Sequence, residues 1–115
     1  MSIKKFPLEA YGAAVSREEL VQAALDEITQ NYREASLSNV ARSYGVSLAY
    51  VSECVRTQTG KTYKELLQKH RMETAARLLR RSDLNIQQII TQVGYENTSY
   101  FYRLFHERYG PSPRD

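Results

Sequence analysis

Arg103 is the residue whose surroundings point most clearly to a chemical role. It is the single basic residue of the aromatic and apolar segment Tyr100-Phe101-Tyr102-Arg103-Leu104. A guanidinium group presents its donors in a planar fork, which fits the edge of a guanine base or the oxygens of a phosphate. We therefore expect Arg103 to contact a base or a phosphate, the alternative being a solvated surface arginine.

The other reactive side chains form no catalytic or metal-binding pattern. Cys54, the single cysteine, lies among the apolar residues Val51 and Val55, so we expect a buried and inert thiol. His70 and His106 are far apart and have no cysteine or histidine partner at a zinc-ligand spacing. Glycine-rich phosphate loops, nucleophile elbows and paired carboxylates are also missing from the sequence. The sequence therefore predicts no enzyme activity, no metal site and no cofactor.

Two segments of the chain share one pattern of apolar residues around a glycine. The first reads Val40-Ala41-x-x-x-Gly45-Val46-Ser47 and continues to Val51, Val55 and Gly60. The second reads Ile89-Ile90-x-x-x-Gly94-Tyr95-Glu96 and continues to Phe101, Phe105 and Gly110. Each copy predicts a short helix, a turn that needs a glycine, and a second helix, which together make a helix-turn-helix motif. The second helix of such a motif is suited to lie in a DNA major groove.

Capping residues and apolar spacing predict six helices and no strand. Ser16 with Glu19, and Thr62 with Glu65, form capping boxes at the first and fourth helices. The other expected N-caps are Ser36, Ser47, Asn85 and Asn97, and the helix-ending glycines are Gly45, Gly60, Gly94 and Gly110. On the fourth helix, the expected apolar side consists of Leu66, Leu67, Ala75, Ala76, Leu78 and Leu79. The prediction is an all-α fold of two helix-turn-helix subdomains joined by a long linker helix, a homeodomain-like pair.

The predicted organisation has four parts. Residues 1–15 are a linker or the remnant of an upstream domain, 16–61 the first subdomain, 62–82 the linker helix, and 83–115 the second subdomain. A linker helix of about 19 residues spans roughly 28 Å. Successive major-groove faces on one side of B-DNA are roughly 34 Å apart. One chain of this design is expected to read two adjacent groove segments, at an asymmetric site because the two motifs differ.

Charge is uneven along the 115 residues, although the net charge is only +3. Residues 36–81 carry nine basic and three acidic side chains, whereas the segments on either side are slightly acidic. This block covers the first motif and the linker helix, so we expect either a phosphate-facing surface or a solvated helix face. The sequence has neither an apolar run near membrane length nor a secretory signal, and one cysteine fits a reducing compartment. These features favour a cytoplasmic protein without a membrane partner.

Residues 17–113 resemble the AraC/XylS family of bacterial transcription regulators. The likeness is carried by Leu37-x-x-Val40-Ala41-x-x-x-Gly45-Val46-Ser47-x-x-Tyr50-Val51-Ser52, Arg71-Met72-x-x-Ala75-x-x-Leu78-Leu79, Ile86-x-x-Ile89-x-x-x-Val93-Gly94-Tyr95-x-x-x-Ser99-Tyr100-Phe101-x-Arg103-x-Phe105 and Gly110-x-Ser112-Pro113. The resemblance implies a domain that binds double-stranded promoter DNA, usually as an activator. It also implies contact with RNA polymerase, and effector sensing through an N-terminal domain absent from this sequence.

The resemblance also assigns DNA-binding residues in both motifs. In the first recognition helix, Ala49, Ser52 and Glu53 would face base edges, and Tyr50 and Arg56 would contact the DNA backbone. In the second, Thr98, Ser99, Tyr102 and Arg103 would face the groove, with His106 near the phosphates. For Tyr102 the alternative is a packed surface aromatic, and for Glu53 it is an ion pair with a nearby cation.

The sequence departs from the family pattern at three places. Glu53 stands where a basic residue is usual, and its carboxylate can accept a hydrogen bond from cytosine but repels phosphate. Val55 replaces a phenylalanine, which leaves the first subdomain with a smaller apolar plug. The family normally continues past Pro113 with a Tyr-Arg pair in a short closing helix, so the C-terminus is expected to be truncated.

Two other functions remain open at this point. The same module can serve as the DNA-binding output domain of a two-component response regulator, which only upstream sequence would distinguish. A helical protein-interaction module without DNA binding is also compatible with the acidic Glu53 and the low net charge. An appendage of a DNA repair methyltransferase is disfavoured, because Cys54 is expected in the core.

Overall fold

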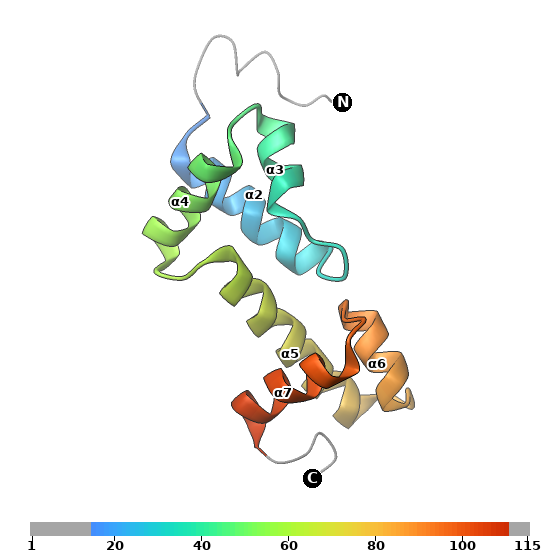
Figure 1. The fold of residues 1–115 in the computed structure, drawn as a ribbon. Coiled ribbons are helices and arrows are strands. Elements are labelled where there is room, and N and C mark those ends of the chain that lie inside the picture. The colour runs from blue at the N-terminus through green and yellow to red at the C-terminus, as the bar shows by residue number, and fades with distance from the viewer. Residues whose placement is uncertain (1–14, 111–115) are drawn as a thin grey trace. The chain divides into compact units, whose positions relative to one another are not determined.

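The computed structural model describes residues 15–110, which form six α-helices and no strand (Figure 1). The helices are α2 (Arg17–Gln30), α3 (Leu37–Tyr44), α4 (Leu48–Thr59), α5 (Tyr63–Arg81), α6 (Ile86–Val93) and α7 (Thr98–Tyr109). The predicted all-α fold is therefore confirmed. The proposed linker at residues 1–15 lies, apart from its last residue, outside the described part, as does the C-terminal end from Pro111.

Helix ends coincide with the capping residues expected from the sequence. The Ser16 hydroxyl accepts a hydrogen bond from the Glu19 amide at 3.0 Å, and the Glu19 carboxylate accepts one from the Ser16 amide at 3.0 Å. Thr62 and Glu65 make the same reciprocal pair at the start of α5. At the other ends, α3 stops at Gly45 and α6 at Gly94, both in left-handed backbone conformation. The ends of the helices are therefore set by local sequence and do not depend on tertiary contacts.

The described chain divides into two compact units, which we describe separately. The first unit contains residues 15–31 and 35–66, and the second contains residues 32–34 and 67–110. The boundary between the two units falls within α5, whose first turn belongs to the first unit and whose remainder belongs to the second. The short segment Tyr32–Glu34, between α2 and α3, belongs to the second unit.

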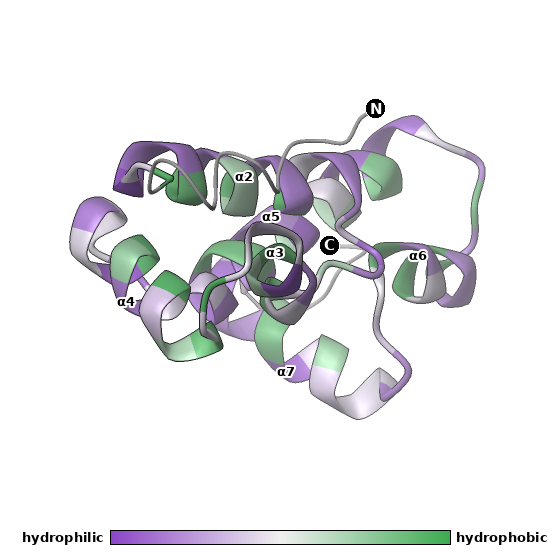
Figure 2. Ribbon diagram, turned by 90° about the horizontal axis from the view of Figure 1, so that it is seen from above, coloured by the Kyte–Doolittle hydropathy of each residue, from purple (hydrophilic) through white to green (hydrophobic). Residues whose placement is uncertain are grey.

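The first unit is a three-helix arrangement in which α2, α3 and α4 pack against one another. Figure 2 shows hydrophobic and hydrophilic residues interleaved along α2 and α4, as expected of helices with one apolar side. The buried side chains are Leu20, Val21, Ala24, Ile28, Val40, Ala41, Val51, Cys54 and Val55. The Cys54 side chain is buried, as the sequence predicted.

The second unit packs α6 and α7 against the second half of α5 around an aromatic core. Its buried residues are Met72, Ala75, Ala76, Ile89, Ile90, Val93, Tyr95, Phe101 and Phe105. Of the predicted apolar side of α5, Ala75 and Ala76 are buried in this core, and Leu78 and Leu79 are half-buried and pack against it; Leu66 and Leu67 are also half-buried. Met72, which the sequence did not assign to this side, also belongs to the core and is 1% exposed, and Thr74 is likewise 1% exposed. Small residues at Ala75 and Ala76 allow close approach to the core, and Met72 fills the remaining space.

Candidate nucleic-acid interface

Helix α4 presents a continuous solvent-exposed face in the first unit. Val51, Cys54 and Val55 point inward with no exposed surface. Because these three residues fix the rotation of the helix, the positions on its opposite side face solvent. All five residues predicted to bind DNA in the first motif are exposed: Ala49, Tyr50, Ser52, Glu53 and Arg56. The structure thus brings them together on one helix and leaves them accessible.

The carboxylate of Glu53 is held by neighbours on its own helix. Arg56 Nη2 donates to both carboxylate oxygens, at 2.8 and 2.7 Å, and the Thr57 hydroxyl donates at 3.1 Å. Hydrogen bonds from Arg56 and Thr57, together with the positive charge of Arg56, lower the pKa of Glu53 below its usual range. The structure adopts the ion pair that the sequence left as an alternative for Glu53. The same pair engages the guanidinium of Arg56.

Two further residues beside this face were missed by sequence reasoning. Arg17, in the first turn of α2, lies with its guanidinium carbon 5.8 Å from the ring centroid of Tyr50. A cation in the first turn of a helix opposes the helix dipole, and this unusual placement is the sequence feature that could have pointed to Arg17. Leu48, the first residue of α4, is 48% exposed although it is a large apolar side chain. The sequence feature that could have pointed to Leu48 is its position directly after the N-cap Ser47.

Helix α7 has the equivalent arrangement in the second unit. Phe101 and Phe105 are buried and set which side of the helix faces outward. Of the predicted residues, Ser99, Arg103 and His106 are exposed, and Thr98 and Tyr102 are half-buried. The ring of Tyr102 packs edge-on against Phe101, with the centroids 5.8 Å apart. Tyr102 therefore has the packing role that the sequence left open, while part of its surface stays accessible.

Arg103 is held over an aromatic ring. Its guanidinium carbon lies 5.0 Å from the centroid of Tyr100, which is within the range of a cation–π interaction. The hydroxyl of Tyr100 accepts a hydrogen bond from the Gln68 side chain of α5 at 2.8 Å. Gln68 thus fixes the ring, and the ring restricts the arginine. A restricted guanidinium loses less conformational entropy when it binds a base edge or a phosphate.

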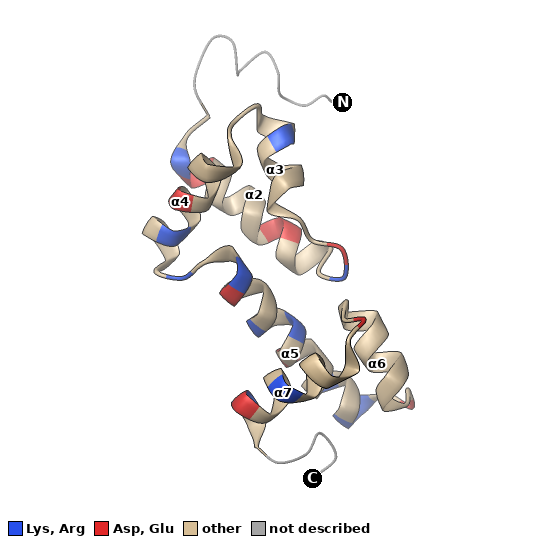
Figure 3. Ribbon diagram, in the orientation of Figure 1, with Lys and Arg blue, Asp and Glu red and all other residues tan. Residues whose placement is uncertain are grey.

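Charge on the second unit lies mainly on α5 and α7. Figure 3 shows basic residues along α5, and α6 carries no charged side chain among residues Ile86–Val93. The exposed face of α6 is lined instead by the uncharged Gln87, Gln88, Thr91 and Gln92. Such amide side chains can donate to phosphate or base acceptors without adding charge.

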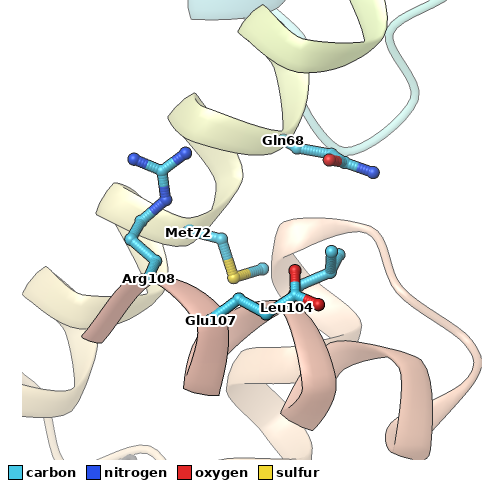
Figure 4. Close-up of a pocket in the computed structure, with 5 residues that line it drawn as sticks. All are labelled: Gln68, Met72, Leu104, Glu107 and Arg108. Atoms are coloured by element: carbon cyan, nitrogen blue, oxygen red, sulfur yellow. The ribbon is translucent and has the colours of Figure 1, made fainter. Parts of the chain in front are cut away.

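A hollow lies between α5 and α7 in the second unit. It encloses about 310 Å³ and is lined by Gln68, Met72, Leu104, Glu107 and Arg108 (Figure 4). Met72 and Leu104 form its apolar floor, while Glu107 and Arg108 bring charges of opposite sign to its edge. Within residues 15–110, no three His, Cys, Asp or Glu side chains are grouped so that they could hold a metal ion. In the same range, none of the helices is both long and apolar enough to cross a membrane.

Several known proteins of similar sequence are named as transcriptional activators. A family described as helix-turn-helix domain matches residues 40–115. The HTH-type transcriptional activator RhaS of Shigella boydii serotype 18 is 32% identical over 82 residues, which cover 71% of this chain and 30% of RhaS. The C-terminal domain of AraT, a response regulator from Geobacillus stearothermophilus, superposes with a TM-score of 0.75 at 34% identity, over 82% of this chain and 79% of that one.

A further solved structure is similar to this chain in fold. The DNA-binding domain of AdpA, solved in complex with a target DNA, has a TM-score of 0.68 at 22% identity, over 84% of this chain and 85% of that one. The fold and these comparisons define a helix-turn-helix DNA-binding domain of a transcription regulator. The chain belongs to the AraC/XylS-type helix-turn-helix family. It spans less than a third of the length of the curated relatives it matches.

Proposed function

We propose that α4 and α7 each enter the DNA major groove, where each helix reads one of two adjacent segments of a promoter. The observation that carries this proposal is the division of each helix into a buried apolar side and an exposed side. On both helices, the positions that the family resemblance assigned to DNA lie outside the core. The two exposed faces differ in sequence, so the preferred DNA site is asymmetric.

The exposed residues suggest a specific division of labour. On α7, Arg103 binds a guanine edge or a phosphate, Thr98 and Ser99 offer small polar contacts, and His106 lies toward the phosphates. On α4, Ala49 and Ser52 face base edges. Its neighbour Leu48 offers an apolar contact of the kind that suits a thymine methyl group. We add Arg17 to the phosphate-contacting group, beside Tyr50.

The pairing of Glu53 with Arg56 weakens the interaction-module alternative. An isolated carboxylate on a recognition helix would repel the DNA backbone, whereas a paired one presents little net charge. Residues 16–61 and 83–115 would then act as the two reading subdomains, with residues 62–82 as the linker.

A further proposal concerns the longer protein to which this domain belongs. We propose a bacterial cytoplasmic activator that contacts RNA polymerase and receives its signal through another domain, and this domain itself has no catalytic activity. The similarity to the response regulator AraT keeps a two-component parent as the second candidate.

Selection from a library of random duplexes at two salt concentrations tests the proposal. The expected result is an asymmetric site with two enriched blocks about one helical turn apart. One enriched block would limit base reading to a single helix. Weak, salt-sensitive binding without enrichment would overturn sequence-specific recognition by this domain.

A further inference from the structure

One arginine of the second unit connects two loops that are far apart in the sequence. Arg71, on α5, donates from Nε to the carbonyl oxygen of Tyr32 at 2.9 Å and from Nη2 to that of Arg33 at 3.2 Å. Its guanidinium carbon also lies 5.1 Å from the ring centroid of Tyr95, just after α6. The donors of Arg71 are thus directed at backbone carbonyls within the protein.

The turn between α6 and α7 is pressed closely against this arginine. A Cβ atom at Gly94 would lie 2.8 Å from the carbonyl oxygen of Arg33 and 2.9 Å from the guanidinium carbon of Arg71. Contacts this short do not occur between real side chains and backbone, so only glycine fits here. Gly94 therefore serves two purposes, since its φ of 107° also ends α6.

Aromatic contacts continue from this turn into the recognition helix. The ring of Tyr95 packs edge-on against Tyr100 and Phe101, with both centroid distances 5.9 Å. Tyr100 in turn lies beneath the guanidinium of Arg103. A continuous series of contacts thus runs from Arg71 through Tyr95 and Tyr100 to Arg103, and every member belongs to the second unit.

We propose that Arg71 is a positioning residue for DNA recognition by α7. By holding the backbone of Tyr32–Glu34 and the ring of Tyr95 together, it sets the α6–α7 turn and hence the orientation of Tyr100 and Arg103. The tripeptide Tyr32–Glu34 lies within the segment 16–61 proposed as the first reading subdomain, but it packs with the second unit and so contributes to the orientation of α7. This inference rests on the proposed function, because it gives Arg71 a role in the specificity of that same helix.

Arg71→Lys is the informative variant. It retains the positive charge, so long-range attraction to DNA is unchanged, but an ammonium cannot bond two carbonyls in fork geometry and also stack on Tyr95. Arg77→Lys is the matched control, because Arg77 is an exposed arginine on the same helix. Both variants are compared with wild type for binding to the selected duplex and to a random duplex, under conditions where circular dichroism shows all three folded.

For Arg71→Lys we expect affinity for the selected duplex to fall by about tenfold or more, the scale of one lost bidentate base contact. Affinity for random DNA should change by less than about twofold, because phosphate contacts persist. Library selection with this variant should lose one block and retain the other. Arg77→Lys should resemble wild type in every assay.

Three results would overturn the proposal. Unchanged binding with a lowered melting temperature would make Arg71 a purely stabilising residue, and equal losses on both duplexes would make it a phosphate contact. If Arg71→Lys does not fold, Arg71→Gln, which keeps one amide donor for a carbonyl, is measured in the same way at low temperature. If the wild type itself selects no block, the proposed function is overturned along with the role of Arg71. If the wild type selects both blocks and Arg71→Lys behaves like it, only the role of Arg71 is overturned.

Discussion

On helix α4, Arg56 donates two hydrogen bonds to the carboxylate of Glu53, at 2.8 and 2.7 Å. The two side chains are one helical turn apart, and each remains more than half exposed. The pair lies in the middle of the face proposed to meet DNA. The guanidinium of Arg56 neutralises the carboxylate of Glu53, so this acidic residue is compatible with DNA binding by the face.

Replacing Glu53 with glutamine should strengthen DNA binding without regard to sequence. The change removes a negative charge and releases Arg56 toward the phosphates, so the dependence of log affinity on log salt should steepen by about one unit. Titrations of a random duplex at several salt concentrations measure this slope. Glu73→Gln is the control, since Glu73 forms a similar exposed pair with Lys69 on α5. An effect confined to one base pair of the selected site would show instead that Glu53 reads a cytosine.

Much of the fold could be predicted from the sequence because its signals are local. Serine, threonine and asparagine caps with glycine stops mark the helix ends, and the structure uses them as predicted. Spacing along one helix likewise indicated that Phe101 and Phe105 face inward and Arg103 outward.

The contacts that escaped prediction join residues distant in sequence. Arg71 reaches carbonyl groups 38 and 39 positions away, and no periodicity reports such a bond. The placement of Arg17 beside Tyr50 depends on how α2 packs against α4.

The glycines that end helices should tolerate alanine to different degrees. Gly45 and Gly60 have positive φ but open space around them, so alanine there should cost about 1–2 kcal/mol of unfolding free energy. At Gly94 alanine would also collide with the Arg33 carbonyl, and we expect a loss of about 3 kcal/mol or more. Urea denaturation of the three variants measures this order. Equal losses would show that the backbone around the Arg33 carbonyl yields to the added methyl group at little cost.

Thr74→Val should stabilise the domain. The Thr74 hydroxyl is buried and makes no hydrogen bond within the described residues, so it contributes only the cost of its desolvation. Valine has nearly the same shape, and its methyl group should raise the unfolding free energy by about 1 kcal/mol. Thr91→Val, at an exposed position of α6, is the control and should be nearly neutral. A clear loss of stability at Thr74 in thermal melts would imply that a partner satisfies the hydroxyl.

The most direct test of base reading by α7 is the affinity of Arg103→Ala for the selected duplex and for a random duplex of equal length, at one fixed salt concentration. Arg108→Ala, which removes an exposed arginine near the end of the same helix, is the control. We expect Arg103→Ala to lose about 1–3 kcal/mol of binding free energy on the selected duplex. Binding to the random duplex should hardly change. Equal losses on the two duplexes would rule out base reading by Arg103, because it would then contact only the DNA backbone.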